Sequence, residues 1–307
     1  MVRSGPAAPA RIPVSSPLMF AWPTVCGDRP AVMGIVNVTP DSFSDGGRFL
    51  DAGAAIAHGA ALVGQGADLL DVGGESTRPG AAPVDAAEEL RRVLPVIEGL
   101  ADGPAAGVPL SIDTAKADVA AAVLGAGASV VNDVTAGRAD PDMFGVVADA
   151  GAGIVLMHMQ GDPRTMQDDP RYDDVVDDVS AFLVARLEAA RAAGLPDDAL
   201  CADPGIGFGK LAHHNLALLA RLPELVARVG VPVLVGTSRK AFLGAVVASA
   251  TGSEVPPPAA RDDATLASAV WALDHGARVV RVHDVRPVVD AARLLHVMQG
   301  IDAAAVA

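Results

Sequence analysis

From residue 31 onward, short apolar runs alternate with longer, alanine-rich segments of helical periodicity. The helical patterns include residues 52–65, 86–100, 115–124, 175–193 and 264–275. A strand followed by a helix pairs in parallel with the next strand, and both faces of such a sheet are covered. This alternation restricts the chain to the α/β class, with eight strands predicted at residues 31–36, 68–72, 110–113, 130–133, 154–158, 200–203, 233–235 and 278–282.

The number and spacing of these units favour a closed barrel. Eight strand–helix units in about 270 residues match the size of a (β/α)8 TIM barrel. The competing fold is an open doubly wound sheet, which usually carries a glycine-rich turn after its first strand. Here that turn reads Asn37-Val38-Thr39-Pro40-Asp41. We therefore predict a single TIM barrel over residues 31–300, in one domain.

The first 30 residues are rich in proline, alanine and serine and show no period, which predicts a flexible N-terminal extension. Its apolar stretch is interrupted by Pro23, which argues against a signal peptide. No apolar run reaches the ~18 residues of a transmembrane helix. Two cysteines, Cys26 and Cys201, are too few for a disulfide framework or a zinc quartet. These features predict a cytoplasmic protein.

The charge balance limits the partners. Lysine and arginine number 23 against 37 acidic residues, which gives a formal net charge of −14. A strongly acidic surface argues against nucleic acid and against an anionic membrane as partners. A small anionic substrate remains compatible, because local cations can oppose the net charge.

Polar residues end every predicted strand. In a barrel these ends converge on one face, where the loops after the strands build the site. A lone aspartate at a strand end usually caps the next helix, so Asp71, Asp133 and Asp284 are interpreted as caps or orienting groups. The full set predicts a functional site made from Asn37, Asp71, Asp113, Asn132, Asp133, His158, Asp203, residues 237–240, Arg281, His283 and Asp284.

Two local patterns have plainer interpretations. Residues 205–210 read GIGFGK, but the Walker spacing of a phosphate loop is not met, because Pro204 and Leu211 occupy the required positions. Met157 and Met159 flank His158. Core packing is the default for methionine there, and one of the two could equally form the floor of a flat-ligand pocket.

Taken together, the strand ends resemble the signatures of the dihydropteroate synthase family. The matching segments occur in order from about residue 31 to 298. They read MGIVNVTPDSFSDGG (33–47), DVGGESTRPG (71–80), SIDT (111–114), NDV (132–134), MHMQG (157–161), DPGIGFGK (203–210), GTSRK (236–240) and RVHDV (281–285). The resemblance implies condensation of a dihydropterin-6-ylmethyl diphosphate with 4-aminobenzoate, giving 7,8-dihydropteroate and diphosphate. It also implies Mg²⁺ as cofactor and a homodimer.

Site roles follow from the same resemblance. The pterin head would contact Asp113, Asn132, Asp203 and Lys240, which supply three acceptors and one donor for it. Arg281 and His283 would bind the diphosphate, with Arg78 as a weaker candidate, and Asn37 would be the magnesium ligand. Thr77 is implied as a substrate contact. The benzoate carboxylate would lie at the helix start near Ser238 and Arg239, and Phe43 would cover its ring. The residues implied in catalysis itself are Asp113, Asp203, Lys240, Arg281 and His283.

Two other functions stay open at this stage. A pterin-dependent methyltransferase on the same barrel would need the pterin pocket but no diphosphate clamp. A non-catalytic paralogue would bind pterin without turnover, and degraded loop motifs would suggest it. The loop motifs are intact here, which favours the synthase. No activated nucleophile is evident, so we expect a dissociative substitution with diphosphate as the leaving group.

Overall fold

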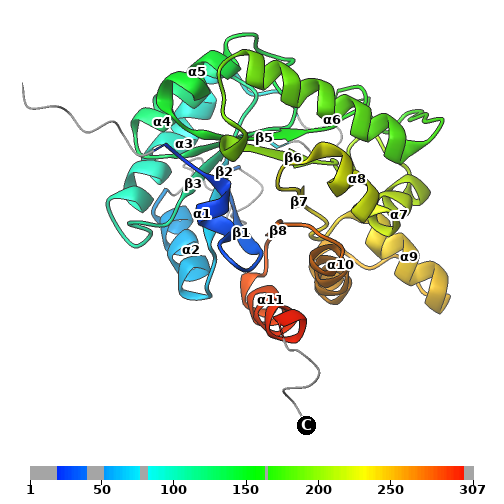
Figure 1. Cartoon of the computed structure of the whole chain (residues 1–307). Helices are drawn as coiled ribbons and strands as arrows, with labels where there is room; N and C mark the ends of the chain where they lie inside the picture. The colour runs from blue at the N-terminus through cyan, green and yellow to red at the C-terminus, as the bar shows by residue number, and fades with distance from the viewer. Residues whose placement is uncertain (1–18, 40–51, 77–81, 163–164, 301–307) are drawn as a thin grey trace, which may run out of the picture.

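Eight parallel strands form a barrel with helices around it in the computed structural model (Figure 1). The structure describes residues 19–39, 52–76, 82–162 and 165–300. Neighbouring strands follow the order β6-β5-β4-β3-β2-β1-β8-β7. A bridge between Ala202 and Val233 joins β6 to the start of β7 and closes the circle. The strands are β1 Ala31–Asn37, β2 Leu69–Gly73, β3 Leu110–Asp113, β4 Val130–Asp133, β5 Gly153–Met157, β6 Leu200–Asp203, β7 Leu234–Val235 and β8 Val279–Val282.

The helices surround the barrel, and the five for which the sequence predicts a range lie within two residues of their predicted bounds. Two of them, α3 and α6, begin at aspartate caps: Asp85 accepts from the backbone N–H of Glu88, and Asp174 from those of Val176 and Asp177. The helices are α2 Ala52–Gly64, α3 Ala86–Ala101, α4 Ala117–Gly125, α5 Met143–Ala150, α6 Val175–Ala192, α7 Ala212–Ala220, α8 Leu222–Val229, α9 Ala241–Thr251, α10 Asp262–Asp274 and α11 Val285–Gly300, with short 3₁₀ turns η1 Asp197–Ala199 and η2 Pro258–Arg261.

The core has two parts, because side chains alternate between the two faces of each strand. The larger part lies between the strands and the helices and is built from valine, leucine, isoleucine and alanine. The smaller part fills the barrel interior with one side chain from most strands, including Met33, Leu69, Val130, Val155, Cys201, Leu234 and Val279. A filled interior leaves the carboxyl ends of the strands as the place for a site.

The prediction of a flexible extension to residue 30 is wrong for residues 19–30. Helix α1 Trp22–Cys26 lies there, and Trp22 is fully buried in the interior cluster. Its indole N–H donates to the carbonyl of Ala199 at 3.2 Å, and Phe20 packs edge-on against its ring. The segment therefore closes the amino-terminal end of the barrel. Residues 1–18 lie outside the described part of the chain.

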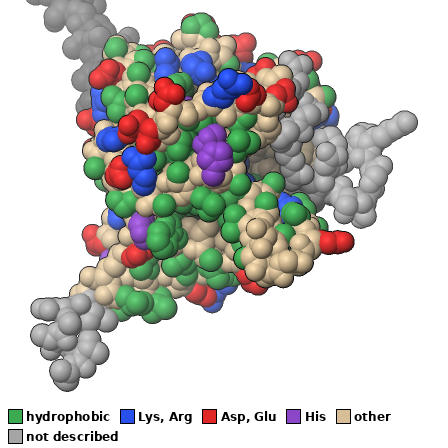
Figure 2. Space-filling view, turned by 90° about the vertical axis from the view of Figure 1, so that its right-hand side faces the viewer, with side chains coloured by type: hydrophobic (Ala, Val, Ile, Leu, Met, Phe, Trp, Pro, Cys, Tyr) green, Lys and Arg blue, Asp and Glu red, His purple; other side chains and the backbone are tan. Residues whose placement is uncertain are grey.

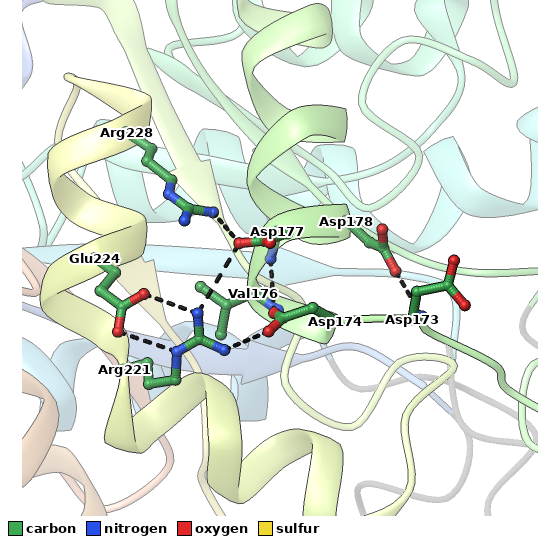
Figure 3. Close-up of polar contacts among 8 residues, drawn as sticks. All are labelled: Asp173, Asp174, Val176, Asp177, Asp178, Arg221, Glu224 and Arg228. Atoms are coloured by element: carbon green, nitrogen blue, oxygen red, sulfur yellow. Dashed lines mark hydrogen bonds and ion pairs between the residues drawn. The ribbon is translucent and has the colours of Figure 1, made fainter.

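Charged residues at the start of α6 are used in structural contacts with α8 (Figure 3). Arg221 bridges Asp174 at 2.7 Å and Glu224 at 2.8 Å, and Arg228 pairs with Asp177 at 2.5 Å. These pairs are exposed, so each adds little stability. The acidic residues at the start of α6 thus cap that helix and connect it to α8, and we do not interpret them as a cation site. In the described ranges no helix is both long and apolar enough to cross a membrane.

Candidate active site

Arg281 lies between two carboxylates at the carboxyl end of the barrel. Its Nε atom donates to Oδ2 of Asp71 at 2.6 Å, and its Nη2 atom to Oδ2 of Asp113 at 3.0 Å. Burial opposes the charge of Arg281, but the two carboxylates outweigh it and raise the pKa of the guanidinium. Burial also raises the pKa of Asp113; Arg281 opposes this shift, and the negative charge of Asp71 adds to it. Three strands, β2, β3 and β8, therefore meet in one charged cluster.

Asn132 joins this cluster from β4. Its Nδ2 atom donates to Oδ2 of Asp71 at 2.9 Å, and its side chain is buried. The next residue, Asp133, accepts from Thr135 and from the backbone N–H of Gly137. Asp133 thus shapes the turn after β4, as its interpretation as an orienting group predicted. Asn132 is the group that β4 turns toward the site.

Asp203 ends β6 with a buried carboxylate. Its Oδ1 atom accepts from the backbone N–H of Gly205 at 2.7 Å, which fixes the side chain and leaves Oδ2 as the second acceptor. Burial raises the pKa of Asp203, and the nearby charge of Lys240 opposes this. An apolar wall lies at the same end of the barrel, made from Val134, Met157, Met159 and Met166 with Phe208 beside them. That cluster includes Met157 and Met159, the two methionines that flank His158.

Lys240 follows β7 and precedes α9. Its ammonium donates to the carbonyl of Ile206 and lies 4.7 Å from the centre of the Phe208 ring. Burial lowers the pKa of Lys240 to about 8, and the carboxylate of Asp203 opposes that shift. The loop after β6 therefore holds Lys240 among the acceptors, as the pterin assignment requires.

Ser238 and His283 contact each other across the β7 and β8 loops. The hydroxyl of Ser238 lies 2.8 Å from Nδ1 of His283 and accepts from the backbone N–H of His283 at 3.1 Å. Arg239 is placed differently: its φ is +58°, and its guanidinium pairs with Asp262 at 2.7 Å. The contacts seen for Arg239 are thus with α10, and its role in substrate binding stays a prediction.

Asn37 ends β1, the neighbour of β8, and its side chain is half-buried. In the part of the chain that the structure describes, no three His, Cys, Asp or Glu side chains gather into a metal site. Mg²⁺ commonly keeps several waters and takes only one or two protein oxygens together with substrate phosphates. One amide oxygen beside the strand of Arg281 fits that pattern. Thr77, Arg78 and Phe43 lie outside the described residues.

His158, at the end of β5, contacts a lysine. Lys210 lies with its ammonium 2.8 Å from Nδ1 of His158, and it donates to the carbonyls of Gly205 and Phe208, each at 3.0 Å. Burial lowers the pKa of His158 to about 2, so its ring is neutral and Nδ1 accepts a hydrogen bond from Lys210. The GIGFGK segment is thus tied together by its own lysine. Sequence reasoning missed this role, although it excluded a phosphate loop.

Comparisons with known proteins identify the family of this chain. The model of a family described as pterin binding enzyme matches residues 33–283. A dihydropteroate synthase from Mycobacterium leprae (strain TN) is 52% identical over 265 residues, which cover 86% of this chain and 92% of that protein.

Two solved structures add the fold and ligands of relatives. The dihydropteroate synthase of Xanthomonas albilineans with 4-aminobenzoic acid is 50% identical with a TM-score of 0.80, and covers 90% of this chain and 95% of that one. The Xanthomonas albilineans enzyme in complex with 7,8-dihydropteroate is 46% identical with a TM-score of 0.77, at the same coverage. Family model and relatives both span the barrel and its polar end, and this chain belongs to the pterin-binding enzyme family, as one of its dihydropteroate synthases, which are transferases.

Proposed function

We propose that this chain joins the methylene carbon of a dihydropterin-6-ylmethyl diphosphate to the amine of 4-aminobenzoate, releasing diphosphate. The observation that carries the proposal is the gathering of buried acceptors and cations at one end of the barrel. Asp71 accepts hydrogen bonds from Asn132 and Arg281, and Arg281 also donates to Asp113. The opposite charges of Asp203 and Lys240 interact at the same end of the barrel.

The pterin head accounts for the acceptors. It carries an amino group and ring N–H donors, and each such donor left unpaired in a buried site costs ~1–3 kcal/mol. Asp113, Asn132 and Asp203 offer carboxylate and amide oxygens to these donors. Lys240 offers its ammonium to the ring carbonyl and a ring nitrogen. The methionine-rich wall beside Phe208 would pack against the flat face of the ring.

The diphosphate accounts for the cations at the end of β8. Arg281 would turn its outer nitrogens to phosphate oxygens, where a guanidinium binds in two-pronged fashion. His283 is two residues further on an extended segment, and therefore on the same side. Asn37 would hold Mg²⁺ with its amide oxygen. Bound there, the ion supplies positive charge that stabilises the leaving diphosphate.

We infer a dissociative substitution, because Arg281 and His283 would stabilise the charge of the leaving diphosphate. The C–O bond to phosphate breaks first, and the resulting cation is delocalised into the dihydropterin ring near Asp113 and Asp203. The amine nitrogen of 4-aminobenzoate then forms the C–N bond and loses a proton. The benzoate carboxylate would lie at the start of α9, after Ser238, where the helix dipole favours an anion.

The direct test is diphosphate release. Purified protein is mixed with Mg²⁺, the pterin diphosphate and 4-aminobenzoate, and diphosphate and 7,8-dihydropteroate are measured together. A synthase forms the two products in equal amounts. Without 4-aminobenzoate it forms neither of them at a comparable rate. Tight pterin binding with no diphosphate release would support a non-catalytic paralogue instead. Transfer of a methyl group would support the methyltransferase.

Replacing Arg281 by alanine is expected to lower the affinity for the pterin diphosphate by about 30- to 100-fold, because a charge-assisted phosphate contact contributes ~2–3 kcal/mol. A pterin without diphosphate makes no such contact. Its affinity should fall less than about 5-fold, even though the variant also removes the partner of Asp71 and Asp113. Calorimetric titration with both ligands measures the difference. Equal losses for the two ligands would place Arg281 against the pterin ring.

Pterin affinity is expected to peak between about pH 7 and about pH 8. Asp113, whose pKa is raised to about 7, must be ionised to accept, so affinity rises through that pH. Lys240, whose pKa is lowered to about 8, must be protonated to donate, so affinity falls above it. Titrations across the range should lose the acidic limb in Asp113→Asn and the basic limb in Lys240→Met. A flat profile in the parent chain would contradict both assignments.

We further propose a homodimer in the cytosol. Figure 2 looks onto the side where α7, α9 and α10 lie in Figure 1, and apolar side chains gather on it. Leu216 on α7 and Val246 and Val247 on α9 are between 38% and 43% exposed, and α7 contacts α9. Exposed apolar side chains that cluster in this way favour burial against a second copy. Light scattering of the parent chain and of a Val246→Glu variant would measure the assembly state.

A further inference from the structure

We infer that Asp71 is a positioning residue of the reaction, which orients two substrate-binding side chains at once from a position without solvent exposure. The inference rests on the proposed function, in which Arg281 binds diphosphate and Asn132 binds pterin. Asp71 touches both through a single oxygen atom, Oδ2, at 2.6 Å and 2.9 Å.

Asp71 is buried behind the groups that would meet substrate. Asp71, Asn132 and Arg281 each lie two residues beyond a side chain that fills the barrel interior, on β2, β4 and β8. Side chains two residues apart on a strand lie on the same face, so all three point inward just above that filled layer. The side chain of Asp71 has no solvent exposure, whereas that of Arg281 is 21% exposed. Asp71 therefore contacts the substrate-binding side chains without being exposed to substrate itself.

The contact with Asn132 fixes which end of the amide meets the ligand. An ionised carboxylate accepts hydrogen bonds and donates none, so the NH₂ group of Asn132 must face Asp71. The amide oxygen is then the atom turned the other way. Pterin donors need an acceptor at that position, and a reversed amide would offer them a second donor instead. Asp71 thus selects the productive orientation of Asn132.

The contact with Arg281 fixes one edge of the guanidinium. Asp71 holds Nε, and Asp113 holds Nη2 by a longer bond of 3.0 Å. Phosphate oxygens can take over the outer nitrogens while Nε stays bound to Asp71. The exchange releases Asp113, which becomes available as a pterin acceptor. Asp71 is thus the fixed point about which Arg281 changes partner.

The remaining oxygen of Asp71, Oδ1, is buried and has no hydrogen-bond partner among the described residues. Burying a carboxylate with one oxygen unpaired costs stability. The charge is used at the other oxygen, Oδ2, where Arg281 and Asn132 both find their acceptor.

The test compares Asp71→Asn and Asp71→Ala with a matched control, Asp68→Asn. Asp68 precedes the same strand at its opposite end, where it pairs with Arg29. Titration calorimetry uses a diphosphate-free pterin and the pterin diphosphate. We expect the affinity for both ligands to fall at least about 10-fold in Asp71→Ala. In Asp71→Asn, which keeps the shape of the side chain but not its charge, it should fall about 3-fold or more. Asp68→Asn should bind both ligands as the parent chain does.

A second readout separates positioning from packing. The charges around Asp113 come from Asp71 on β2, Glu89 on α3, Asp133 on β4 and Arg281 on β8, with Lys240 acting from the β7 loop. When Asp71 loses its charge, Asp113 is the one ionised partner of Arg281 among these contacts, and the repulsion between Asp71 and Asp113 is removed. The acidic limb of pterin binding should therefore move to lower pH in Asp71→Asn. Packing alone would leave the limb in place, because asparagine has the same shape.

The outcomes are distinct. Weakened binding of both ligands with a shifted limb supports the inference. Unchanged affinity and an unchanged limb in a folded Asp71→Asn overturn it, and loss for the diphosphate ligand alone overturns the part that concerns Asn132. If the parent chain binds no pterin, that result contradicts the proposed function itself and not the role of Asp71. Should Asp71→Ala not fold, Asp71→Asn alone decides.

Discussion

Asp203→Ala is expected to weaken pterin binding by at least about 100-fold, the largest loss from any single side chain in the cluster. The buried carboxylate is the natural partner of adjacent amino and ring N–H donors. Its removal leaves those donors unpaired, at ~1–3 kcal/mol each. Calorimetry with a diphosphate-free pterin analogue measures the loss.

An asparagine at the same position gives a sharper control. The backbone N–H of Gly205 donates to Oδ1 of Asp203 at 2.7 Å, so an asparagine oxygen would take that place. Its NH₂ group would then face the pterin donors, and Asp203→Asn should bind as poorly as the alanine variant. Burial raises the pKa of Asp203, so the charged form costs the fold stability at neutral pH. Both variants should therefore remain folded by circular dichroism. Parent-like affinity in a folded variant would remove Asp203 from the pterin site.

The strands and five of the helices could be predicted from the sequence because their signals are local. Short apolar runs at regular spacing define buried parallel strands, and the barrel geometry then brings the polar strand ends together. Helix α1 was missed because it contains Pro23 and follows a proline-, alanine- and serine-rich segment that shows no period. Proline is well tolerated in the first turn of a helix, and Trp22 beside it was the available signal for a buried anchor.

The contacts that could not be predicted join residues distant in the sequence. Asp71 looked like one strand-end aspartate among several, and only the barrel brings it to Asn132 and Arg281 at once. Arg239 adjoins Lys240 in the sequence and seemed to belong to the same site. Its left-handed backbone, rare for a residue other than glycine, turns its side chain to Asp262. Contacts of this kind depend on the closed barrel and its loops, and no local sequence pattern predicts them.

Lys210→Met is expected to lower the free energy of unfolding by about 2–4 kcal/mol at neutral pH. Lys210 is 2% exposed, and its ammonium meets the ring of His158 and the carbonyls of Gly205 and Phe208. Methionine has a similar length but no donor, so three buried acceptors lose their partner, at ~1–3 kcal/mol each. Relief of the buried ammonium offsets part of that cost. Urea unfolding of the two proteins measures the difference.

The pH dependence of that difference tests the cause. Burial lowers the pKa of Lys210 well below its ordinary value of 10.5, so the folded state releases this proton before the unfolded state does. Stability from Lys210 is therefore fully present above pH 10.5, and it is lost as the pH falls through the lowered pKa of the folded state. The gap between parent and Lys210→Met should widen with rising pH, by up to about 1.4 kcal/mol per unit.

Lys116→Met is the matched control. Lys116 pairs with Glu75 and Glu89 at 2.5 Å each, and these hydrogen bonds raise its pKa against the effect of burial. Both its folded and unfolded forms are charged below pH 10, so its contribution should not change over the range in which that of Lys210 grows. A gap for Lys210→Met that stays constant with pH would mean that Lys210 is buried as the charged ammonium. The carbonyls of the GIGFGK segment would then act as a cage for a cation, and the loop that holds Lys240 would depend on charge rather than on neutral hydrogen bonds.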